Sequence, residues 1–284
     1  MKKPVLIVIV FLSVAILLLS SCNRNEEPKL KVVTSTSLIE YIVQQVGGSL
    51  VDVTNLVPPN QHPGNFDVKP SDIEKLARAS LFLLHGFPGE GFADELIASA
   101  NNPNLIVSKA SIDGNWMIPS VQIAATDKIA SILSEVDNEN AAAYQQSAVE
   151  YKYRIQAKET DIRARLSEVD ISKINVIASI RQADFLTWAG FNVVATFGGT
   201  QSLTPQTIQD LIDQGKTSNV VLIVNNIQDG QDAGKAIAEE LGAENLNLSN
   251  FLGGLDNTET WEKAIDQNVT ILLDAVAKIR STTK

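Results

Sequence analysis

Residues 56–91 read LVPPNQHPGNFDVKPSDIEKLARASLFLLHGFPGEG and are the most informative stretch of the chain. The stretch begins in an expected strand at 51–57 and continues through a loop that is rich in proline. A helix capped by Ser71 or Asp72 is expected next, and it leads to a buried strand at 81–84 and a glycine-rich loop. Strands and helices that alternate in this way are typical of an α/β fold.

Short runs rich in Val, Ile and Leu alternate with helical patterns in two blocks along the chain. Runs without polar–apolar alternation are typical of parallel strands that are covered on both faces. We therefore expect an α/β fold class, with two doubly wound α/β lobes joined by a long rigid backbone helix. The strands are expected at 30–33, 51–57, 81–84, 105–107, 174–178, 193–196, 220–224 and 245–248.

A long helical stretch without Gly or Pro connects the two blocks. One helix is expected at 121–136, and a second, capped by Asp137, is expected to continue to about Val169. At 1.5 Å per residue the second helix would be a rod of roughly 40–45 Å, long enough to join both lobes. The alternative is a helical hairpin within one domain. The expected domains are an N-terminal lobe at 30–136, a bridging helix at 137–169 and a C-terminal lobe at 170–284.

Residues 1–21 have the pattern of a lipoprotein signal peptide, with two lysines followed by an apolar run. The run ends in Leu-Ser-Ser-Cys, which resembles a bacterial lipobox, in which Cys22 becomes the first mature residue and carries lipid. A transmembrane anchor is the alternative, but the apolar run is shorter than the about 20 residues that a span needs. Residues 22–29 are then expected to be a tether.

Cys22 is the only cysteine, so the mature domain has no disulfide and its stability must come from packing. About 255 mature residues are enough for two lobes of about 100–150 residues each. The net charge is −10, and it becomes −12 without the two lysines of the signal peptide. An acidic surface argues against nucleic acid or anionic lipid as a partner. We expect a monomer that contacts the membrane through its lipid anchor only.

The stretch at 56–91 resembles the zinc/manganese-binding solute-binding proteins of ABC importers. The resemblance extends over about residues 30–280, and its last part is a Gly-Gly loop followed by a helix expected at 261–273. It implies an extracytoplasmic receptor that delivers a small solute to an ABC permease in the membrane. The residues that carry it most strongly are Pro58, Pro59, Pro63, Phe66, Asp67, Pro70, Ser71, Asp72, Gly86 and Glu90.

The resemblance also locates the family's four metal ligands, which are three histidines and one acid. In this chain their positions fall on Gly64, Gly114, Ser179 and Asn250, or on Ser249 in place of the last. Zinc binds thiolate, imidazole or carboxylate, and manganese binds carboxylate or imidazole. None of these residues has such a group, so the resemblance implies a degenerate metal site.

A displaced metal site is the alternative. The only histidines are His62 and His85, both in expected cleft loops of the first lobe, and Asp67 and Glu90 are near them in sequence. Two imidazoles and two carboxylates are chemically adequate for zinc, so zinc or manganese remains open as a cargo. Lone histidines on loops are more often surface or hydrogen-bonded residues.

A small organic solute is the other possibility. Ligands of open α/β sheets bind outside the carboxyl ends of the strands, and Arg181 is expected there with a fork that matches a carboxylate or phosphate. An ion pair between Arg181 and Asp184 is the plainer interpretation. Apolar walls could come from Trp116 and from nearby phenylalanines. The candidate ligand-binding residues are Gly64, Trp116, Ser179, Arg181, Asn225 and Asn250.

Catalysis is not expected, because the chain has no nucleophile elbow, no zincin motif and no second cysteine. The resemblance therefore implies a solute-binding lipoprotein of an ABC importer, for a metal held differently or for a small organic solute. The alternative is a non-transport lipoprotein that uses the same fold as a binding or scaffolding surface.

Overall fold

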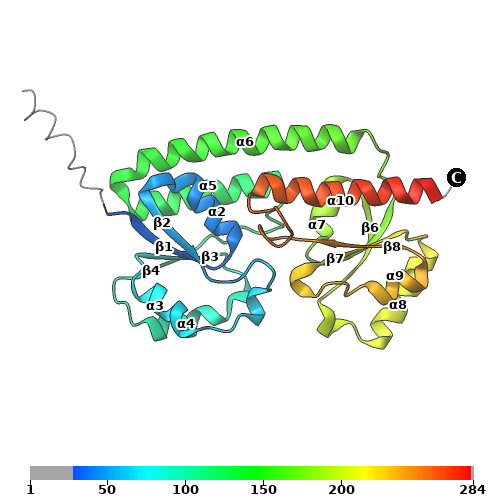
Figure 1. Cartoon of the computed structure of the whole chain (residues 1–284), viewed down its shortest axis with the longest axis horizontal. Helices are drawn as coiled ribbons and strands as arrows, with labels where there is room; N and C mark the ends of the chain where they lie inside the picture. Colours follow the sequence, from blue (N-terminus) through cyan, green and yellow to red (C-terminus); the bar gives the residue numbers. More distant parts are fainter. Residues whose placement is uncertain (1–27, 283–284) are drawn as a thin grey trace, which may run out of the picture.

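The computed structural model describes residues 28–282, which form two α/β lobes arranged along the long axis of the molecule (Figure 1). Each lobe contains a four-stranded sheet, with strand order β2-β1-β3-β4 in the first and β6-β5-β7-β8 in the second. All neighbouring strands are parallel. The expected fold class of two doubly wound lobes is confirmed. The expected signal peptide, Cys22 and most of the expected tether lie outside the described residues.

All eight expected strands are present, with ends that differ from the expectation by at most two residues. The expectation that the strands are covered on both faces is wrong for β4, an edge strand in which Ile106 and Val107 are 43% and 39% exposed. The strands of the first lobe are β1 (Leu30–Thr34), β2 (Val51–Asn55), β3 (Leu81–Leu84) and β4 (Ile106–Lys109). Those of the second are β5 (Asn175–Ser179), β6 (Asn192–Phe197), β7 (Leu222–Asn226) and β8 (Glu244–Leu248).

Helices cover both faces of the first sheet. Successive side chains of β3 point to opposite faces, so Leu81 and Leu83 join one core cluster while Phe82 and Leu84 join another. The cluster that contains Phe82 and Leu84 lies under α3 and α4. The cluster that contains Leu81 and Leu83 lies under α2, α5 and the long helix that follows α5 in the chain (Figure 1). The helices are α2 (Ser37–Gly47), α3 (Pro70–Ala77), α4 (Phe92–Ala100) and α5 (Pro119–Val136).

The second lobe repeats this arrangement. Ile177 of β5 faces α8 and α9, whereas Val176 and Ala178 belong to the cluster that includes α7 and α10. That cluster also contains Leu81 and Leu83 of the first lobe, so one continuous core connects the two lobes. The helices are α7 (Ala183–Ala189), α8 (Pro205–Thr217), α9 (Lys235–Leu241) and α10 (Trp261–Thr282).

The helices α8 and α3 begin in different ways. At the start of α8 the amide of Thr207 donates to Oγ1 of the capping residue Thr204 at 3.2 Å, and Pro205 follows at the first helical position. The expected cap of α3 is wrong, because Lys69 is the capping residue and Asp72 lies one turn inside the helix. Oδ2 of Asp72 accepts from the amide of Lys69 at 3.1 Å, which satisfies one free donor at the helix start.

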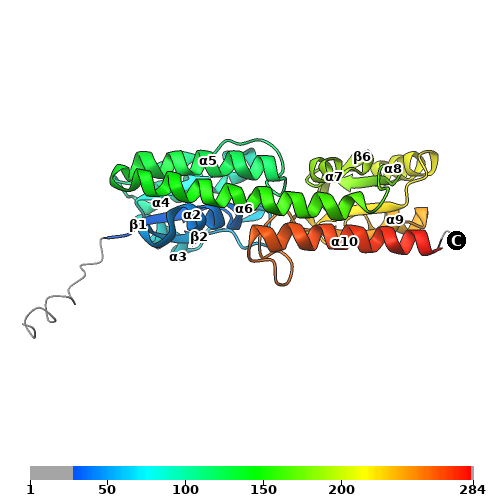
Figure 2. The ribbon, with the colours of Figure 1, turned by 90° about the horizontal axis from the view of Figure 1, so that it is seen from above.

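The helix α6 (Ala141–Ser167) has 27 residues and is therefore about 40 Å long. It packs against α2 and α5 in the first lobe and against α10 farther along (Figures 1 and 2). Asp137 does not cap α6, because its Oδ2 accepts from the hydroxyl of Tyr144 at 2.5 Å. The first part of α6 thus packs against α5 in the first lobe, and the rest extends over the second lobe.

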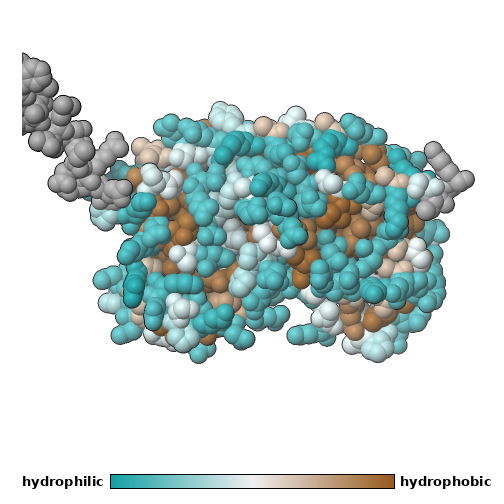
Figure 3. Space-filling model, in the orientation of Figure 1, coloured by the Kyte–Doolittle hydropathy of each residue, from teal (hydrophilic) through white to brown (hydrophobic). Residues whose placement is uncertain are grey.

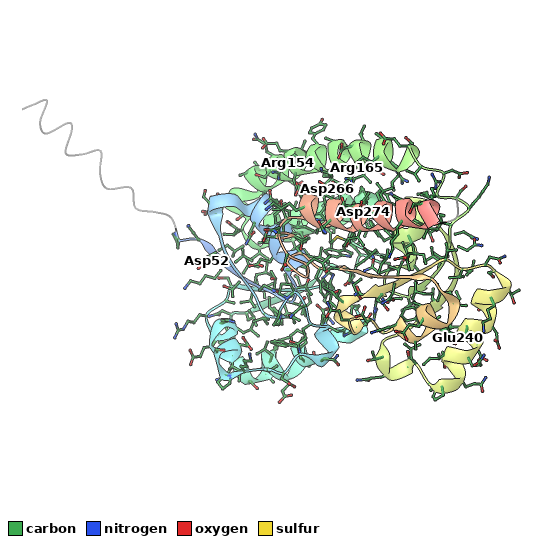
Figure 4. The ribbon with its side chains drawn as sticks, turned by 45° about the vertical axis from the view of Figure 1, so that its right-hand side comes forward. Asp52, Arg154, Arg165, Glu240, Asp266 and Asp274 are labelled. Atoms are coloured by element: carbon green, nitrogen blue, oxygen red, sulfur yellow. The ribbon has the colours of Figure 1, made fainter. Side chains whose placement is uncertain are left out.

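Charged contacts join α6 to the last helix. Arg165 of α6 lies 3.1 Å from Asp266 of α10, and Lys158 lies 2.9 Å from the other oxygen of the same carboxylate (Figure 4). Trp261 at the start of α10 donates from Nε1 to the carbonyl oxygen of Trp116 at 3.0 Å. The helix α10 therefore also connects the second lobe to the first.

Polar side chains cover most of the visible surface, which is hollowed between the two lobes (Figure 3). Within residues 28–282, no helix has the length and apolar composition that crossing a membrane requires.

Candidate functional site

A cavity of about 380 Å³ lies between the lobes and is formed mainly by loops at the carboxyl ends of strands. Its position follows from the topology, because the carboxyl ends of parallel strands meet at one edge of each sheet. The first lobe contributes Leu38, His62, Pro63, His85, Gly86, Phe87, Ser111, Ile112, Asp113, Gly114, Asn115 and Trp116. The second lobe contributes Ile180, Arg181, Asp184, Asn250 and Phe251.

Four of the lining residues carry rings that lie close to one another. The imidazole of His85 lies edge-on to Trp116, with ring centroids 4.2 Å apart. The same imidazole is 5.3 Å from the ring of Phe87 and 6.5 Å from that of Phe251. These residues, called the aromatic cup below, come from three loops and from both lobes.

His85 is a buried, neutral member of the aromatic cup. Its Nε2 lies 2.6 Å from Oγ1 of Thr36, and burial lowers its pKa to about 3. The imidazole is therefore uncharged at neutral pH. Since Thr36 already occupies one ring nitrogen, a metal could reach that nitrogen only by displacing the hydroxyl.

Glu90 stabilises the loop that carries His85. Its carboxylate oxygens accept from the amides of His85 at 3.0 Å and of Gly86 at 2.7 Å. These amides are the donors that a glycine-rich loop would offer to a phosphate. Glu90 thus already satisfies them and belongs to the scaffold of the loop.

Arg181, His62 and Asp229 form a polar cluster at the rim of the cavity, called the rim cluster below. Nη2 of Arg181 lies 3.2 Å from Nε2 of His62, and its Nε lies 3.7 Å from Oδ2 of Asp229. The backbone carbonyl of Arg181 also accepts from Nδ2 of Asn115 at 2.8 Å. The acid that pairs with Arg181 is therefore Asp229, and the expected ion pair with Asp184 is wrong.

The imidazole of His62 cannot satisfy both of its neighbours at once. Its Nδ1 accepts from the amide of Gly64 at 2.9 Å, while Arg181 presents N–H donors to Nε2. A neutral imidazole has a single acceptor nitrogen, so only one of these two donors is satisfied. Burial lowers the pKa of His62 below its usual value, although the nearby carboxylate of Asp229 opposes that shift.

Glycine occupies two of the four positions that the resemblance assigns to metal ligands, and the surrounding structure restricts a side chain at both. Gly64 lies in a short 3₁₀ turn at 63–65, where a Cβ atom would be 3.0 Å from Nδ1 of His62. Gly114 lines the cavity with φ +100°, a conformation that a residue with a side chain rarely adopts. The ring of His62 thus restricts a side chain at Gly64, and the backbone restricts one at Gly114.

The other two positions carry neutral polar side chains. Ser179 ends β5, where its Oγ accepts from the amide of Arg181 at 3.3 Å. Asn250 lines the cavity, and its buried Oδ1 has no hydrogen-bond partner among the described residues. The two glycines, the serine and the asparagine supply no imidazole, thiolate or carboxylate, which are the groups that bind zinc and manganese.

The candidate displaced site is not assembled either. His62 and His85 both line the cavity, but Asp67 is exposed and lines a separate hollow. Glu90 bonds to backbone amides instead of facing the histidines. No group of three or more His, Cys, Asp and Glu in residues 28–282 could hold a metal ion.

Asn225 is part of the scaffold and not of the cavity lining. Its Nδ2 donates to the carbonyl of Leu246 at 2.7 Å and its Oδ1 accepts from the amide of Gly234. Sequence reasoning did not assign Asp113, Asn115 or Asp229 to the site. The first two lie in the loop after β4, at the carboxyl end of a strand, where ligands are expected. The direction of the Asn115 side chain depends on its contact with Arg181 of the other lobe.

Comparisons with known proteins agree with the fold. A family model described as zinc-uptake complex component A, periplasmic, matches residues 32–275. The iron-binding protein YfeA of Yersinia pestis is 24% identical over 271 residues, covering 88% of this chain and 86% of that protein. The manganese-binding lipoprotein MntA of Bacillus subtilis is 25% identical over 216 residues, covering 68% of this chain and 69% of that protein.

The structure also resembles solved structures. The solute-binding protein FpvC from Pseudomonas aeruginosa in complex with Mn²⁺ has a TM-score of 0.76 at 22% identity, covering 88% of this chain and 99% of its own. A Cd-bound periplasmic metal-binding protein from Candidatus Liberibacter asiaticus has a TM-score of 0.75 at 21% identity, covering 87% and 99%. At these identities the similarity shows the fold.

Proposed function

This chain belongs to the family of the periplasmic zinc-uptake complex component A, and from that premise we propose that it is an extracytoplasmic solute-binding lipoprotein of an ABC importer. The observation that carries the proposal is the family match over residues 32–275, together with a cavity at the facing carboxyl ends of both sheets. Its relatives are named as metal-binding or substrate-binding proteins, which supports a role in binding and not in catalysis.

The lipid anchor is part of the same proposal. Cys22 follows an apolar run and a Leu-Ser-Ser motif, and several relatives are named as lipoproteins. Lipid on Cys22 would hold the lobes at the outer side of a membrane through the short polar segment at 23–29. The membrane partner is then an ABC permease, to which the receptor delivers its solute.

The cargo proposed for this receptor is not a metal held in the inherited way. The four ligand positions supply neither anionic groups nor imidazoles, and the candidate displaced residues do not converge. The lack of metal donors also favours a second candidate, a non-transport lipoprotein that uses the fold as a binding or scaffolding surface.

Photo-crosslinking in native membranes tests the two candidates. Ile180 lies on the cavity rim and is 60% exposed, so a photoreactive amino acid at this position would contact a partner docked over the cleft. Tyr153 on α6 is 68% exposed and serves as a matched control away from the cavity. Import predicts that Ile180, but not Tyr153, captures a polytopic permease together with its ATPase. Equal capture at both positions, or none at Ile180, would contradict import and favour the scaffold candidate.

A further inference from the structure

We propose that the cavity binds a small organic cation of the alkylammonium class. The inference rests on the proposed function, because it assumes that the cavity is the solute site. Four observations support it: the negative charge of the lining, the aromatic cup, the unpartnered oxygen of Asn250, and the contacts that Arg181 already makes with Asp229 and His62.

The lining has more negative than positive groups. Its charged side chains are Asp113, Asp184 and Arg181, and Asp229 lies directly behind Arg181. His62 and His85 add no positive charge at neutral pH, because burial lowers the pKa of both. Carboxylates at the rim of a cleft attract cations and repel anions.

The aromatic cup offers the surface that an alkylammonium group prefers. The rings of Phe87, Trp116 and Phe251 lie around the neutral imidazole of His85 in one connected set. The face of an aromatic ring attracts a cation, and a poorly hydrated quaternary ammonium loses less solvation there than a metal ion does. A cup of this kind thus favours an organic cation over Zn²⁺ or Mn²⁺.

The side chain of Asn250 favours a ligand that carries a hydrogen-bond donor. Asn250 lines the cavity, and its Oδ1 is shielded from solvent and has no partner within residues 28–282. A buried acceptor without a partner carries an energetic cost that a ligand N–H or O–H would relieve. A carboxylate has only acceptors and would leave that oxygen unsatisfied.

Arg181 is not free to bind an organic acid. Its guanidinium contacts Asp229 and His62, and its carbonyl is held by Asn115. An anion would therefore compete with the existing carboxylate of Asp229.

The cavity volume of about 380 Å³ lies within the range of about 300–1,000 Å³ that small-molecule sites have, and it is far larger than one bare ion needs.

Three probes of one shape separate charge from size. Choline has a trimethylammonium group and a hydroxyl donor, 3,3-dimethylbutan-1-ol is its neutral carbon analogue, and 3,3-dimethylbutanoate is an anionic one. Calorimetric titration of the mature protein after dialysis is expected to show that choline binds at least 10-fold more tightly than both analogues. Equal affinity for choline and the neutral alcohol would overturn the proposal, because charge would then play no part.

Matched aromatic variants locate the binding site. Phe87→Leu keeps apolar volume but removes one ring of the cup, and it is expected to weaken choline binding by about 3- to 30-fold. Phe66→Leu is the control, because Phe66 lines the separate hollow and packs edge-on against Phe92. Equal losses in both variants, with unchanged melting temperatures, would place the cation elsewhere and overturn the proposal.

Matched charge variants test the electrostatic part. Asp184→Asn should weaken choline binding, whereas Asp274→Asn, on the exposed side of α10, removes the same charge far from the cavity (Figure 4). Arg181→Ala should tighten choline binding, because it removes a like charge and frees Asp229. Binding of 3,3-dimethylbutanoate that is lost in Arg181→Ala would establish an organic acid instead and overturn this proposal. The proposed import function would survive that result, since it is tested separately by photo-crosslinking from Ile180 and Tyr153.

Discussion

The guanidinium of Arg181 lies 3.2 Å from the imidazole of His62, so a side chain of the second lobe closes over one of the first. A second contact across the cleft runs from Nε2 of Gln228 to the carbonyl of Pro59 at 2.8 Å. On the opposite side of the molecule, α6 and α10 connect the lobes (Figure 1). The angle between the lobes is thus constrained from both sides of the cavity.

We predict that binding of a solute changes the radius of gyration very little. Hinge closure requires a few residues that absorb large backbone changes, and α6 provides a continuous helix of 27 residues instead. Small-angle X-ray scattering of the mature protein with and without a saturating ligand measures this. A clear decrease of the radius on binding would show that the lobes move and that α6 does not fix them.

A second prediction concerns metals. A cognate ligand at 100 times its Kd stabilises the native state by about 2.7 kcal/mol. For a chain of this size that would raise the melting temperature by about 5–10 °C. We expect no such shift with micromolar zinc or manganese after treatment with a chelator. If a shift occurs and is abolished by His62→Ala and by His85→Ala, the displaced site exists. A shift that persists in both variants would mean that the ligands lie elsewhere.

A third prediction uses the buried imidazole of His85. Burial lowers its pKa to about 3, so the unfolded chain, with a pKa near 6.5, binds more protons between these values. Stability therefore falls as the pH drops below about 6.5, by about 2 kcal/mol at pH 5. Urea unfolding at pH 7 and pH 5 should show this loss in the wild type and a smaller one in His85→Asn. Carboxylates titrate in both proteins, so equal losses would contradict the neutral buried state.

Restoring a histidine at Gly114 is predicted to be costly. The φ angle of +100° strains any residue with a side chain, and a Cβ atom would lie 3.2 Å from Cγ2 of Val121. Gly114→His should lower the free energy of unfolding by about 1–3 kcal/mol. Gly91→His is the matched control, because φ is −60° and no atom lies within 4 Å of a Cβ there. Similar unfolding midpoints for the two variants would contradict the strain.

The last prediction addresses the anchor. If Cys22 carries lipid, Cys22→Ser should release the protein into a soluble fraction or leave it unprocessed, as cell fractionation and mass spectrometry would show. Membrane retention that is unchanged in the variant, with residues 1–21 still attached in the wild type, would instead indicate a transmembrane anchor.

The strands could be predicted well because the two sheets bury short apolar runs that the sequence displays directly. The exception is β4, whose apolar residues Ile106 and Val107 are exposed, because hydrophobicity alone does not show which strand lies at an edge. The start of α8 also depends on neighbouring residues only, because Thr204 caps the helix and Pro205 occupies its first position.

The site was less predictable, because its side chains are directed by contacts between distant segments. Asn225 is the second-last residue of β7, and its side chain points towards β8 and the start of α9. Asp229 pairs with Arg181 although 48 positions separate them in the sequence. No local pattern encodes such a pairing.

The connection of the lobes by α6 and α10 has a kinetic consequence for any molecule in the cavity. A receptor that opens as a whole exchanges its ligand at the speed of domain motion, on the microsecond to millisecond scale. With the lobes held together, escape depends on rotamer changes of rim side chains such as Arg181 and Ile180, and exposed side chains change rotamer in picoseconds to nanoseconds. The dissociation rate constant is then governed by the strength of the contacts inside the cavity. A membrane partner could accelerate release by drawing Arg181 away from His62 and Asp229, without moving either lobe.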